Sequence, residues 1–317
     1  MVTVKAVVAG SFGGPEVLAL VDAPDPVAGA GEVVVTVEAS GVGYVDIMAR
    51  RGEYGPLSVP GFTPGVEIAG VVTEVGEGVD GGWLGRRVFS QVQGGGYAQK
   101  VLVGADSLAT VPEGVGAGEA VAIGVNGLVA RIGLERAGVG RGDSVVVRGA
   151  RGGIGLMAVQ QAAALGAEVT AVVSRGRPDD RLEEFGASRV VPSAEAGASA
   201  EYDVVLDTVG GAEVGAWVSR LRPNGRFVLC GAAGGAPDTA FGEALLENYH
   251  KSPTFIAFSL GSLPGPAIVP QAQVLFEAAA AGRLRGVVQE VLPLAQAHQA
   301  HRLVEGGGLF GKVVLTP

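Results

Sequence analysis

A short glycine-rich turn near the middle of the chain is the clearest candidate for chemistry. It reads Ala150-Arg-Gly-Gly-Ile-Gly155, which has the form A-x-G-x-x-G. Without a side chain, Gly152 would let the backbone approach a pyrophosphate, and Gly155 would let the following helix lie close on the preceding strand. Free amides at the start of a helix, together with the helix dipole, favour phosphate anions. The pattern therefore predicts dinucleotide binding by Ala150, Arg151, Gly152, Gly153, Ile154 and Gly155.

The neighbours of this turn distinguish dinucleotide binding from an ordinary tight turn. With 54 glycines in 317 residues, the spacing alone carries little weight. A Val-rich run that begins at Gly142 precedes the turn, however, and residues 156–165 follow it with good helix formers that end at Gly166. Strand, turn and helix in this order are what a nucleotide-binding unit requires, so we prefer dinucleotide binding.

The end of the next expected strand indicates which dinucleotide binds. An NAD site usually places Asp or Glu about 20 residues past the turn, on the ribose hydroxyls. Here the strand is followed by Ser174-Arg175-Gly176-Arg177. A hydroxyl and a guanidinium suit a 2′-phosphate, because Arg can bind phosphate through two parallel hydrogen bonds. We expect NADPH, held by Ser174 and Arg175; the alternative is a solvated basic turn, with Asp179 or Asp180 reaching the ribose.

The segments around the turn alternate between strand and helix, whereas the rest of the chain is rich in short strands. The alternation predicts a parallel, doubly wound α/β domain, with strands at residues 168–173, 203–206 and 226–230 and helices at 117–132, 156–165 and 179–185. Val-rich segments broken by Gly and Pro predict antiparallel strands at residues 2–8, 32–38, 66–75, 87–91 and 97–103. We expect the tail to complete this β domain, with helices at 270–281 and 295–304 and strands at 287–292 and 312–315.

Length, charge and cysteine content exclude several classes of protein. At 317 residues the chain fits two domains. A net charge of −9, with no Lys/Arg cluster longer than two residues, gives nucleic acid no basic footprint. The single cysteine, Cys230, rules out a disulfide within the chain. No run approaches the roughly 20 apolar residues of a membrane span, and the N-terminus has a strand pattern, so we expect a soluble, cytoplasmic protein without membrane contact.

Several segments, in order along nearly the whole chain, resemble the quinone oxidoreductase (zeta-crystallin-like) branch of the medium-chain dehydrogenase/reductase superfamily. They are Ser40-Gly-Val-Gly-Tyr-Val-Asp46, Pro64-Gly-Val-Glu-Ile-Ala-Gly70, Gly95-Gly-Tyr-Ala-Gln99, the glycine-rich turn, Asp203-Val-Val-Leu-Asp-Thr-Val-Gly-Gly211, Asn224-Gly-Arg-Phe-Val-Leu-Cys-Gly231 and Gly311-Lys-Val-Val-Leu-Thr-Pro317. The resemblance implies a Rossmann domain at residues 122–256 and a split, mainly β, GroES-like catalytic domain at 1–121 and 257–317. It also implies a cofactor in the cleft between them, and a homodimer.

The same resemblance implies further residues beside the cofactor. Those expected to flank or hold it are Asn126, Val129, Val209, Cys230, Gly231, Ala232, Ala233, Phe255, Ile256 and Phe258.

Zinc is not expected, and some of the family's usual side chains are missing. In zinc-dependent relatives a Cys ligand stands at the position of Gly43 and a His ligand at that of Val66, and neither residue found here can bind a metal. A structural zinc lobe would need four cysteines. The family often has Asn at Gly43, Thr at Val129 and Tyr at Ser193, so the resemblance implies an altered pocket.

Without a Lewis acid, hydride transfer needs an acceptor that is already activated, such as a quinone or a conjugated enone. By resemblance Tyr54, in a loop that lines the family's pocket, is the first candidate for proton delivery, with Tyr44 or solvent as alternatives. Both tyrosines could equally be wall residues, because an ordinary phenol is a poor donor. We expect Asp46 to satisfy backbone amides and Glu67 to form an ion pair.

Three functions follow from these observations. The first is an NADPH:quinone reductase, for which the zinc-free pattern and Ser174-Arg175 argue. The second is an NADPH-dependent 2-alkenal or enoyl reductase, which shares fold and cofactor. The third is a non-catalytic NADPH-binding protein, which the departures at Gly43, Val129 and Ser193 favour.

Overall fold

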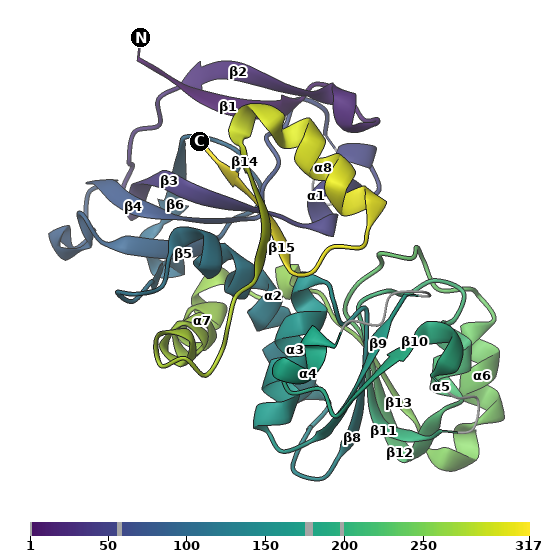
Figure 1. Ribbon diagram of the computed structural model, residues 1–317. Coiled ribbons are helices and arrows are strands. Elements are labelled where there is room, and N and C mark those ends of the chain that lie inside the picture. The colour runs from purple at the N-terminus through teal and green to yellow at the C-terminus, as the bar shows by residue number, and fades with distance from the viewer. Residues whose placement is uncertain (1, 56–58, 175–179, 197–199) are drawn as a thin grey trace. The chain divides into compact units, whose positions relative to one another are not determined.

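A computed structural model describes residues 2–55, 59–174, 180–196 and 200–317 of the chain. The chain forms two compact units, Met1–Val125 with Leu263–Pro317 (unit 1) and Asn126–Ser262 (unit 2; Figure 1). It passes from unit 1 into unit 2 within helix α2, Ala117–Arg136. The boundaries expected from the sequence, after residues 121 and 256, lie a few residues earlier.

Unit 2 is built on a six-stranded sheet in which all the strand pairs are parallel, as the alternating pattern predicts. Its order is β10-β9-β8-β11-β12-β13, so the chain builds outward in one direction from β8 and then restarts on the other side with β11. The strands are β8 (Ser144–Arg148), β9 (Glu168–Val173), β10 (Arg189–Pro192), β11 (Tyr202–Asp207), β12 (Leu221–Leu229) and β13 (Thr254–Ala257).

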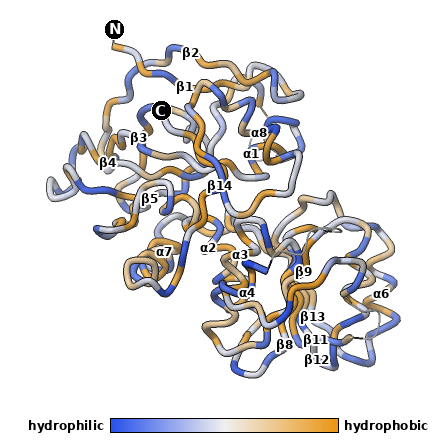
Figure 2. The backbone as a smooth tube through the Cα atoms, in the orientation of Figure 1, coloured by the Kyte–Doolittle hydropathy of each residue, from blue (hydrophilic) through white to orange (hydrophobic). Residues whose placement is uncertain are grey.

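Helices cover both faces of this sheet (Figure 1). On one side lie α3 (Gly153–Ala164) and α4 (Arg181–Glu184), and on the other α5 (Val214–Val218) and α6 (Phe241–Glu247). A parallel strand covered on both faces reads as a continuous apolar run, and the Ser-Val-Val-Val-Arg sequence of β8 follows that rule. The strands of this sheet are therefore mostly apolar (Figure 2). The core on the face covered by α5 and α6 contains Val146, Val205, Trp217 and Phe227.

Unit 1 contains a seven-stranded, mainly antiparallel sheet and a separate β1–β2 hairpin. The sheet order is β14-β15-β3-β4-β5-β7, with β6 also paired to β3. The tail completes this sheet, because Val313–Leu315 pair antiparallel with Ser40–Val42, and the β14–β15 pair is parallel. The strands are β1 (Thr3–Ala9), β2 (Leu18–Pro24), β3 (Glu32–Val42), β4 (Glu67–Val75), β5 (Arg87–Gln91), β6 (Lys100–Gly104), β7 (Ala109–Thr110), β14 (Val288–Pro293) and β15 (Lys312–Thr316).

Among the described residues of unit 1, the α-helices that lie wholly inside the unit are α1 (Tyr44–Arg51), α7 (Gly265–Ala280) and α8 (Ala297–Gly306). Helix α7 begins five residues before the predicted start at Pro270, which lies inside the helix. Helix α2 is long and apolar enough to cross a membrane by length and composition alone, but most of that stretch is buried, as in the core helix of a soluble protein.

Candidate functional site

The glycine-rich turn connects the carboxyl end of β8 to the start of α3, as predicted. Gly149 adopts a positive φ of 72°, which favours glycine. The amides of Gly149 and Ala150 donate to Val172 O, at 3.1 and 3.2 Å, and so attach the turn to the end of β9. Gly152 is the N-cap of α3, and its amide donates to Gly149 O at 3.0 Å.

Gly155 and Gly152 differ in the space around them, in the way their predicted roles require. A Cβ on Gly155 would overlap Gly149 O and lie 2.7 Å from Ala150 Cα, so the helix packs here directly on the turn. A Cβ on Gly152 would meet only Gly149 O, at 3.4 Å, and Gly152 is exposed. The turn therefore has one closely packed glycine and one open glycine, and the open one can admit a ligand.

The beginning of unit 2 lies against the same turn. Asn126, on α2, is 6% exposed, and a Cβ on Gly153 would lie 2.7 Å from its Cγ. Gln161 Nε2 of α3 donates to Gly127 O at 3.1 Å, which fixes α2 against α3. Val129, one turn further along α2, is buried. The structure thus brings the predicted Asn126 to the glycine-rich turn.

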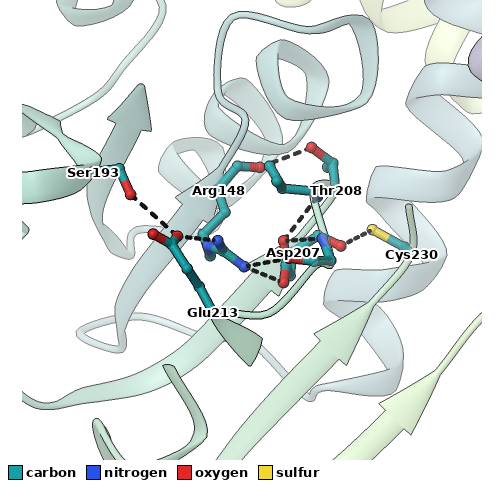
Figure 3. A network of polar contacts seen from close by, with 8 residues as sticks. Arg148, Ser193, Asp207, Thr208, Glu213 and Cys230 are labelled. Atoms are coloured by element: carbon teal, nitrogen blue, oxygen red, sulfur yellow. Dashed lines mark hydrogen bonds and ion pairs between the residues drawn. The ribbon is translucent and has the colours of Figure 1, made fainter. Parts of the chain in front are cut away.

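The loop after β11 meets the turn through a polar cluster (Figure 3). Asp207 Oδ1 accepts hydrogen bonds from the amides of Val209 and Gly210, at 2.8 and 3.1 Å. Thr208 Oγ1 donates to Arg148 O at 2.8 Å. Arg148 Nη1 donates to Asp207 Oδ2 at 2.5 Å. Burial raises the pKa of the Asp207 carboxyl above its ordinary value, and Arg148 and the two amides offset part of that shift.

The predicted segment after β12 adjoins the same loop. The Cys230 amide donates to Asp207 O at 2.9 Å, and a Cβ on Gly231 would overlap Thr208 O. Cys230 is half-buried, and burial of its sulfur raises the pKa of the thiol, which keeps it protonated and unreactive. Ala232 is half-buried and Ala233 exposed.

The predicted aromatic residues near β13 pack against other side chains of unit 2. The ring of Phe255 stacks on that of Phe227, with centroids 5.2 Å apart, and also contacts Phe241. Phe258 is buried, and the Arg136 guanidinium lies 4.3 Å from its ring centroid. Ile256, Arg151 and Ile154 are half-buried and Ser174 is exposed just after β9, whereas Arg175 lies outside the described residues.

In unit 1 the candidate residues surround the start of α1. Asp46 is fully buried, and its carboxylate accepts hydrogen bonds from the amides of Gly43 and Gly65, both at 2.9 Å. Burial raises the pKa of Asp46 to about 6. The prediction that Asp46 satisfies backbone amides is confirmed. Tyr44, the first residue of α1, and Tyr54 are both half-buried.

A chain of buried polar groups extends from Asp46 and escaped the sequence analysis. Arg50 Nη1 lies 3.3 Å from His301 Nδ1, and Tyr97 Oη lies 3.1 Å from His301 Nε2. Because Arg only donates, Nδ1 must accept and Nε2 must carry the proton toward Tyr97. Burial, the largest cause, and Arg50 lower the pKa of His301 to about 3. The Tyr97 hydroxyl is left to donate to Asp46, its hydrogen-bond partner.

The positions where zinc-dependent relatives hold a metal carry no suitable donors here. The Gly43 amide is bonded to Asp46, and Val66 is apolar. Glu67, next in the chain, forms a buried ion pair with Lys312, which confirms its predicted role. Across the described ranges, no group of three or more His, Cys, Asp or Glu side chains could hold a metal ion.

Comparison with known proteins agrees with this architecture. Residues 29–125 match the family model of the alcohol dehydrogenase GroES-like domain, and residues 170–315 match that of a zinc-binding dehydrogenase. Quinone oxidoreductase of Sus scrofa is 29% identical over 96% of this chain and 95% of its own. Quinone oxidoreductase of Thermus thermophilus, whose structures include its complex with NADPH, is 35% identical, with a TM-score of 0.85, over 99% of this chain and 100% of its own. Acryloyl-coenzyme A reductase of Sulfurisphaera tokodaii is 30% identical over 60% of this chain and 66% of its own.

Proposed function

Since the chain belongs to the zinc-free quinone oxidoreductase branch of the medium-chain dehydrogenase/reductase superfamily, we propose that this oxidoreductase uses NADPH to reduce a quinone. The observation that carries the proposal is the glycine-rich turn, closely packed at Gly155 and open at Gly152, at the carboxyl end of β8. The NADPH complex of the Thermus thermophilus relative supports the cofactor. The quinone oxidoreductases of Thermus thermophilus and Sus scrofa support the acceptor.

The residues of the turn would hold the pyrophosphate, with backbone amides and the start of α3 facing the anion. Ser174 stands exposed at the end of β9, where a hydroxyl can reach a 2′-phosphate, and we assign the same task to Arg175. Asn126 and the segment Cys230–Ala233 would border the nicotinamide. Bound NADPH supplies the hydride, so the side chains mainly orient the cofactor and exclude water.

After hydride transfer the reduced quinone takes up one proton, which gives the hydroquinone. We assign this step to Tyr54 first, with Tyr44 or solvent as alternatives. Because the residues at the zinc-ligand positions, Gly43 and Val66, cannot polarise a simple ketone, the acceptor must be electron-poor already. A quinone meets that condition.

A direct assay tests the proposal. NADPH consumption is followed at 340 nm with 1,4-benzoquinone and with no acceptor, and the same pair of reactions is run with NADH. We expect quinone-dependent oxidation with a clear preference for NADPH. Oxidation that stays at the background rate with several quinones would rule the activity out, and an equal or greater rate with NADH would rule out the cofactor preference.

An enoyl or 2-alkenal reductase is the second candidate, because acryloyl-coenzyme A reductase of Sulfurisphaera tokodaii is also similar to this chain. The two activities share fold and cofactor and differ in the acceptor. Turnover on an α,β-unsaturated ketone or thioester, compared with turnover on a quinone under equal NADPH, separates them. A higher kcat/KM for the enone would favour the second candidate.

A non-catalytic NADPH-binding protein is the third candidate. Ser193, where the family often has Tyr, has its hydroxyl 3.4 Å from Glu213 Oε2. Tight NADPH binding by calorimetry, with neither quinone nor enone reduced, would support this candidate.

We also propose a cytoplasmic homodimer. Strand β13 is an edge strand of its sheet, and the nearby Leu246 and Tyr249 are 73% and 76% exposed. An unpaired strand edge and exposed apolar side chains both favour association with a second copy. Sedimentation of the wild-type chain should give twice the monomer mass, and Leu246→Glu should reduce it.

A further inference from the structure

Arg148 occupies a position in unit 2 that the proposed function leaves unexplained. It is the last residue of β8 and immediately precedes the glycine-rich turn, and Asp207 is the last residue of the neighbouring β11. The order in which the chain adds strands to the sheet changes direction between β8 and β11. In open α/β sheets this switch point, at the carboxyl ends of the strands, is where ligands bind.

Two kinds of contact join the ends of the two strands (Figure 3). The two carboxylate oxygens of Asp207 have different partners. One accepts a hydrogen bond from Arg148 Nη1 at 2.5 Å, and the other accepts from the amides of Val209 and Gly210. In the opposite direction Thr208 Oγ1 donates to the Arg148 carbonyl at 2.8 Å. The loop after β11 is therefore held to the glycine-rich turn through side chain and backbone together.

The ion pair is buried, with Arg148 3% and Asp207 0% exposed. A buried pair of this kind adds little net stability, because desolvation of the two charges offsets their attraction. Well-packed apolar side chains could fill the same space. The Arg148–Asp207 pair therefore contributes mainly by fixing the geometry of the two strand ends.

Arg148 acts on the turn through its contacts and not as a ligand for phosphate. Its terminal nitrogens already meet protein acceptors, since Nη2 donates to Glu213 Oε2 at 2.7 Å and Nη1 also lies 3.4 Å from Gly210 O. The guanidinium lies 5.2 Å from the centroid of the Trp217 ring. Its polar face is thus turned to the β11 loop and α5.

A shift of the loop after β11 would also displace the glycine-rich turn, because the two segments are closely packed. A Cβ on Gly149 would overlap Thr208 Oγ1, and one on Gly231 would overlap Thr208 O. Thr208 is therefore in close contact with both the turn and the segment after β12. We infer that Arg148 is a positioning residue that, through Asp207 and Thr208, holds these three segments in the one arrangement that binds the cofactor pyrophosphate. This inference rests on the cofactor site proposed above.

Arg148→Met tests the inference, with Arg226→Met as the matched control. Arg226 forms a less buried ion pair at the opposite end of the same sheet, with its side chain 24% exposed, donating to Asp143 Oδ2 and to Ala137 O, both at 2.8 Å. For each variant the melting temperature, the Kd of NADPH and the Kd of 2′-AMP are measured by scanning calorimetry, titration calorimetry and NMR. 2′-AMP carries the 2′-phosphate but no pyrophosphate.

We expect both variants to melt earlier, and only Arg148→Met to bind NADPH more weakly. The Kd should rise about tenfold or more, the effect of losing one hydrogen bond to a charged phosphate. Binding of 2′-AMP should stay unchanged, and Arg148→Lys should recover part of the NADPH affinity. In steady-state assays the KM for NADPH should rise while kcat at saturating NADPH changes little.

Thr208→Val keeps the test informative if Arg148→Met does not fold, because it removes only the bond to the Arg148 carbonyl. Its NADPH Kd should also rise. An unchanged NADPH affinity in the folded variants, an equal loss in Arg226→Met, or an equal loss for 2′-AMP would each overturn the inference. A wild-type protein that binds no NADPH would instead overturn the proposed function.

Discussion

The two units each bury an arginine between polar partners, but the surroundings of the two side chains differ. Arg148 of unit 2 is the last residue of β8. Its partners are Asp207, the last residue of β11, and Thr208, the first residue of the loop that follows β11 and meets the glycine-rich turn. Arg50 of unit 1 lies within helix α1, and its partners His301 and Glu305 both belong to helix α8. The first arginine therefore orders loops that can meet a ligand, whereas the second joins two helices.

The chain of buried polar groups in unit 1 does reach a candidate site, but at the end opposite Arg50. From His301 it continues through Tyr97 to Asp46, whose carboxylate holds the amides of Gly43 and Gly65. The comparison indicates that a buried charge supports a site only where its partners belong to the loops of that site. Each of the following predictions tests this distinction.

The largest effect is expected from Arg50→Met. Arg50 is 1% exposed, and its loss removes the donor to His301 Nδ1 and to the Gly13 carbonyl, while Glu305 keeps its ion pair with Arg51. The free energy of unfolding should fall by about 3 kcal/mol, because buried acceptors on His301 and Gly13 lose a charged donor and Arg50 leaves its packed position. NADPH affinity should stay at the wild-type value at low temperature, unlike in Arg148→Met. Urea unfolding and calorimetric titration measure the two quantities, and a weaker NADPH complex would erase the contrast between the arginines.

Gly155→Ala and Gly152→Ala should separate packing from binding within the turn. The alanine at 155 would overlap Gly149 O, so we expect a loss of about 3 kcal/mol in stability from overpacking. The alanine at 152 has room and an ordinary φ of −70°, so its stability should change by less than about 0.5 kcal/mol. Its NADPH Kd should nevertheless rise at least tenfold, the cost of losing one hydrogen bond to a charged group. Wild-type affinity in Gly152→Ala would mean that the pyrophosphate lies elsewhere.

The pH dependence of unit 1 should reveal two opposed titrations. The raised pKa of Asp46, about 6, gives stability that is present below pH 3.8 and is lost as the pH rises through 6. The lowered pKa of His301, about 3, gives stability that is present above pH 6.5 and is lost as the pH falls through 3. Between these limits the two slopes oppose each other.

His301→Gln should expose the contribution of Asp46 alone. A glutamine amide can still accept from Arg50 and donate to Tyr97, but it does not titrate. As the pH rises from 4.5 to 6, the free energy of unfolding of the variant should fall by about 2 kcal/mol relative to that of the wild type, because the variant lacks the gain that His301 provides. Thermal melts in a single buffer series measure this difference, and parallel curves for the two proteins would contradict the assignment.

The smallest effect is expected from Glu213→Gln. Glu213 pairs with Arg148, but its side chain is 61% exposed and screened by water. Stability should change by no more than about 0.5 kcal/mol, and NADPH affinity should hardly move. A large loss of affinity would show that the outer carboxylate, and not Asp207, orients Arg148.

Local patterns in the sequence predicted the strand, turn and helix of unit 2 that carry the proposed nucleotide site. A glycine turn works through backbone spacing, and the strand and helix that position it are adjacent in the chain, so the motif and its context can be read together. The parallel sheet and the returning tail followed from periodicity in the same way. One signal in the sequence pointed to Arg148, which is a charged residue at the end of an otherwise apolar strand.

The polar chain of unit 1 had no such signal. Tyr97 and His301 are 204 residues apart, and only the packing of α8 brings them together. Helix α1 was also missed, because its N-cap is Gly43, which has no side chain to mark the start of the eight-residue helix at Tyr44. Distant contacts between ordinary residue types leave no spacing for a sequence analysis to detect.

The pairing of β15 with β3 has a consequence for synthesis on the ribosome. Unit 2 is one continuous stretch of chain, and it can fold as soon as Asn126–Ser262 has emerged. The sheet of unit 1 must wait for Lys312–Thr316, and until then the Ser40–Val42 end of β3 lacks its neighbouring strand and Glu67 lacks its ion-pair partner Lys312. Strand β3 therefore leaves the exit tunnel long before β15, the strand that completes its pairing.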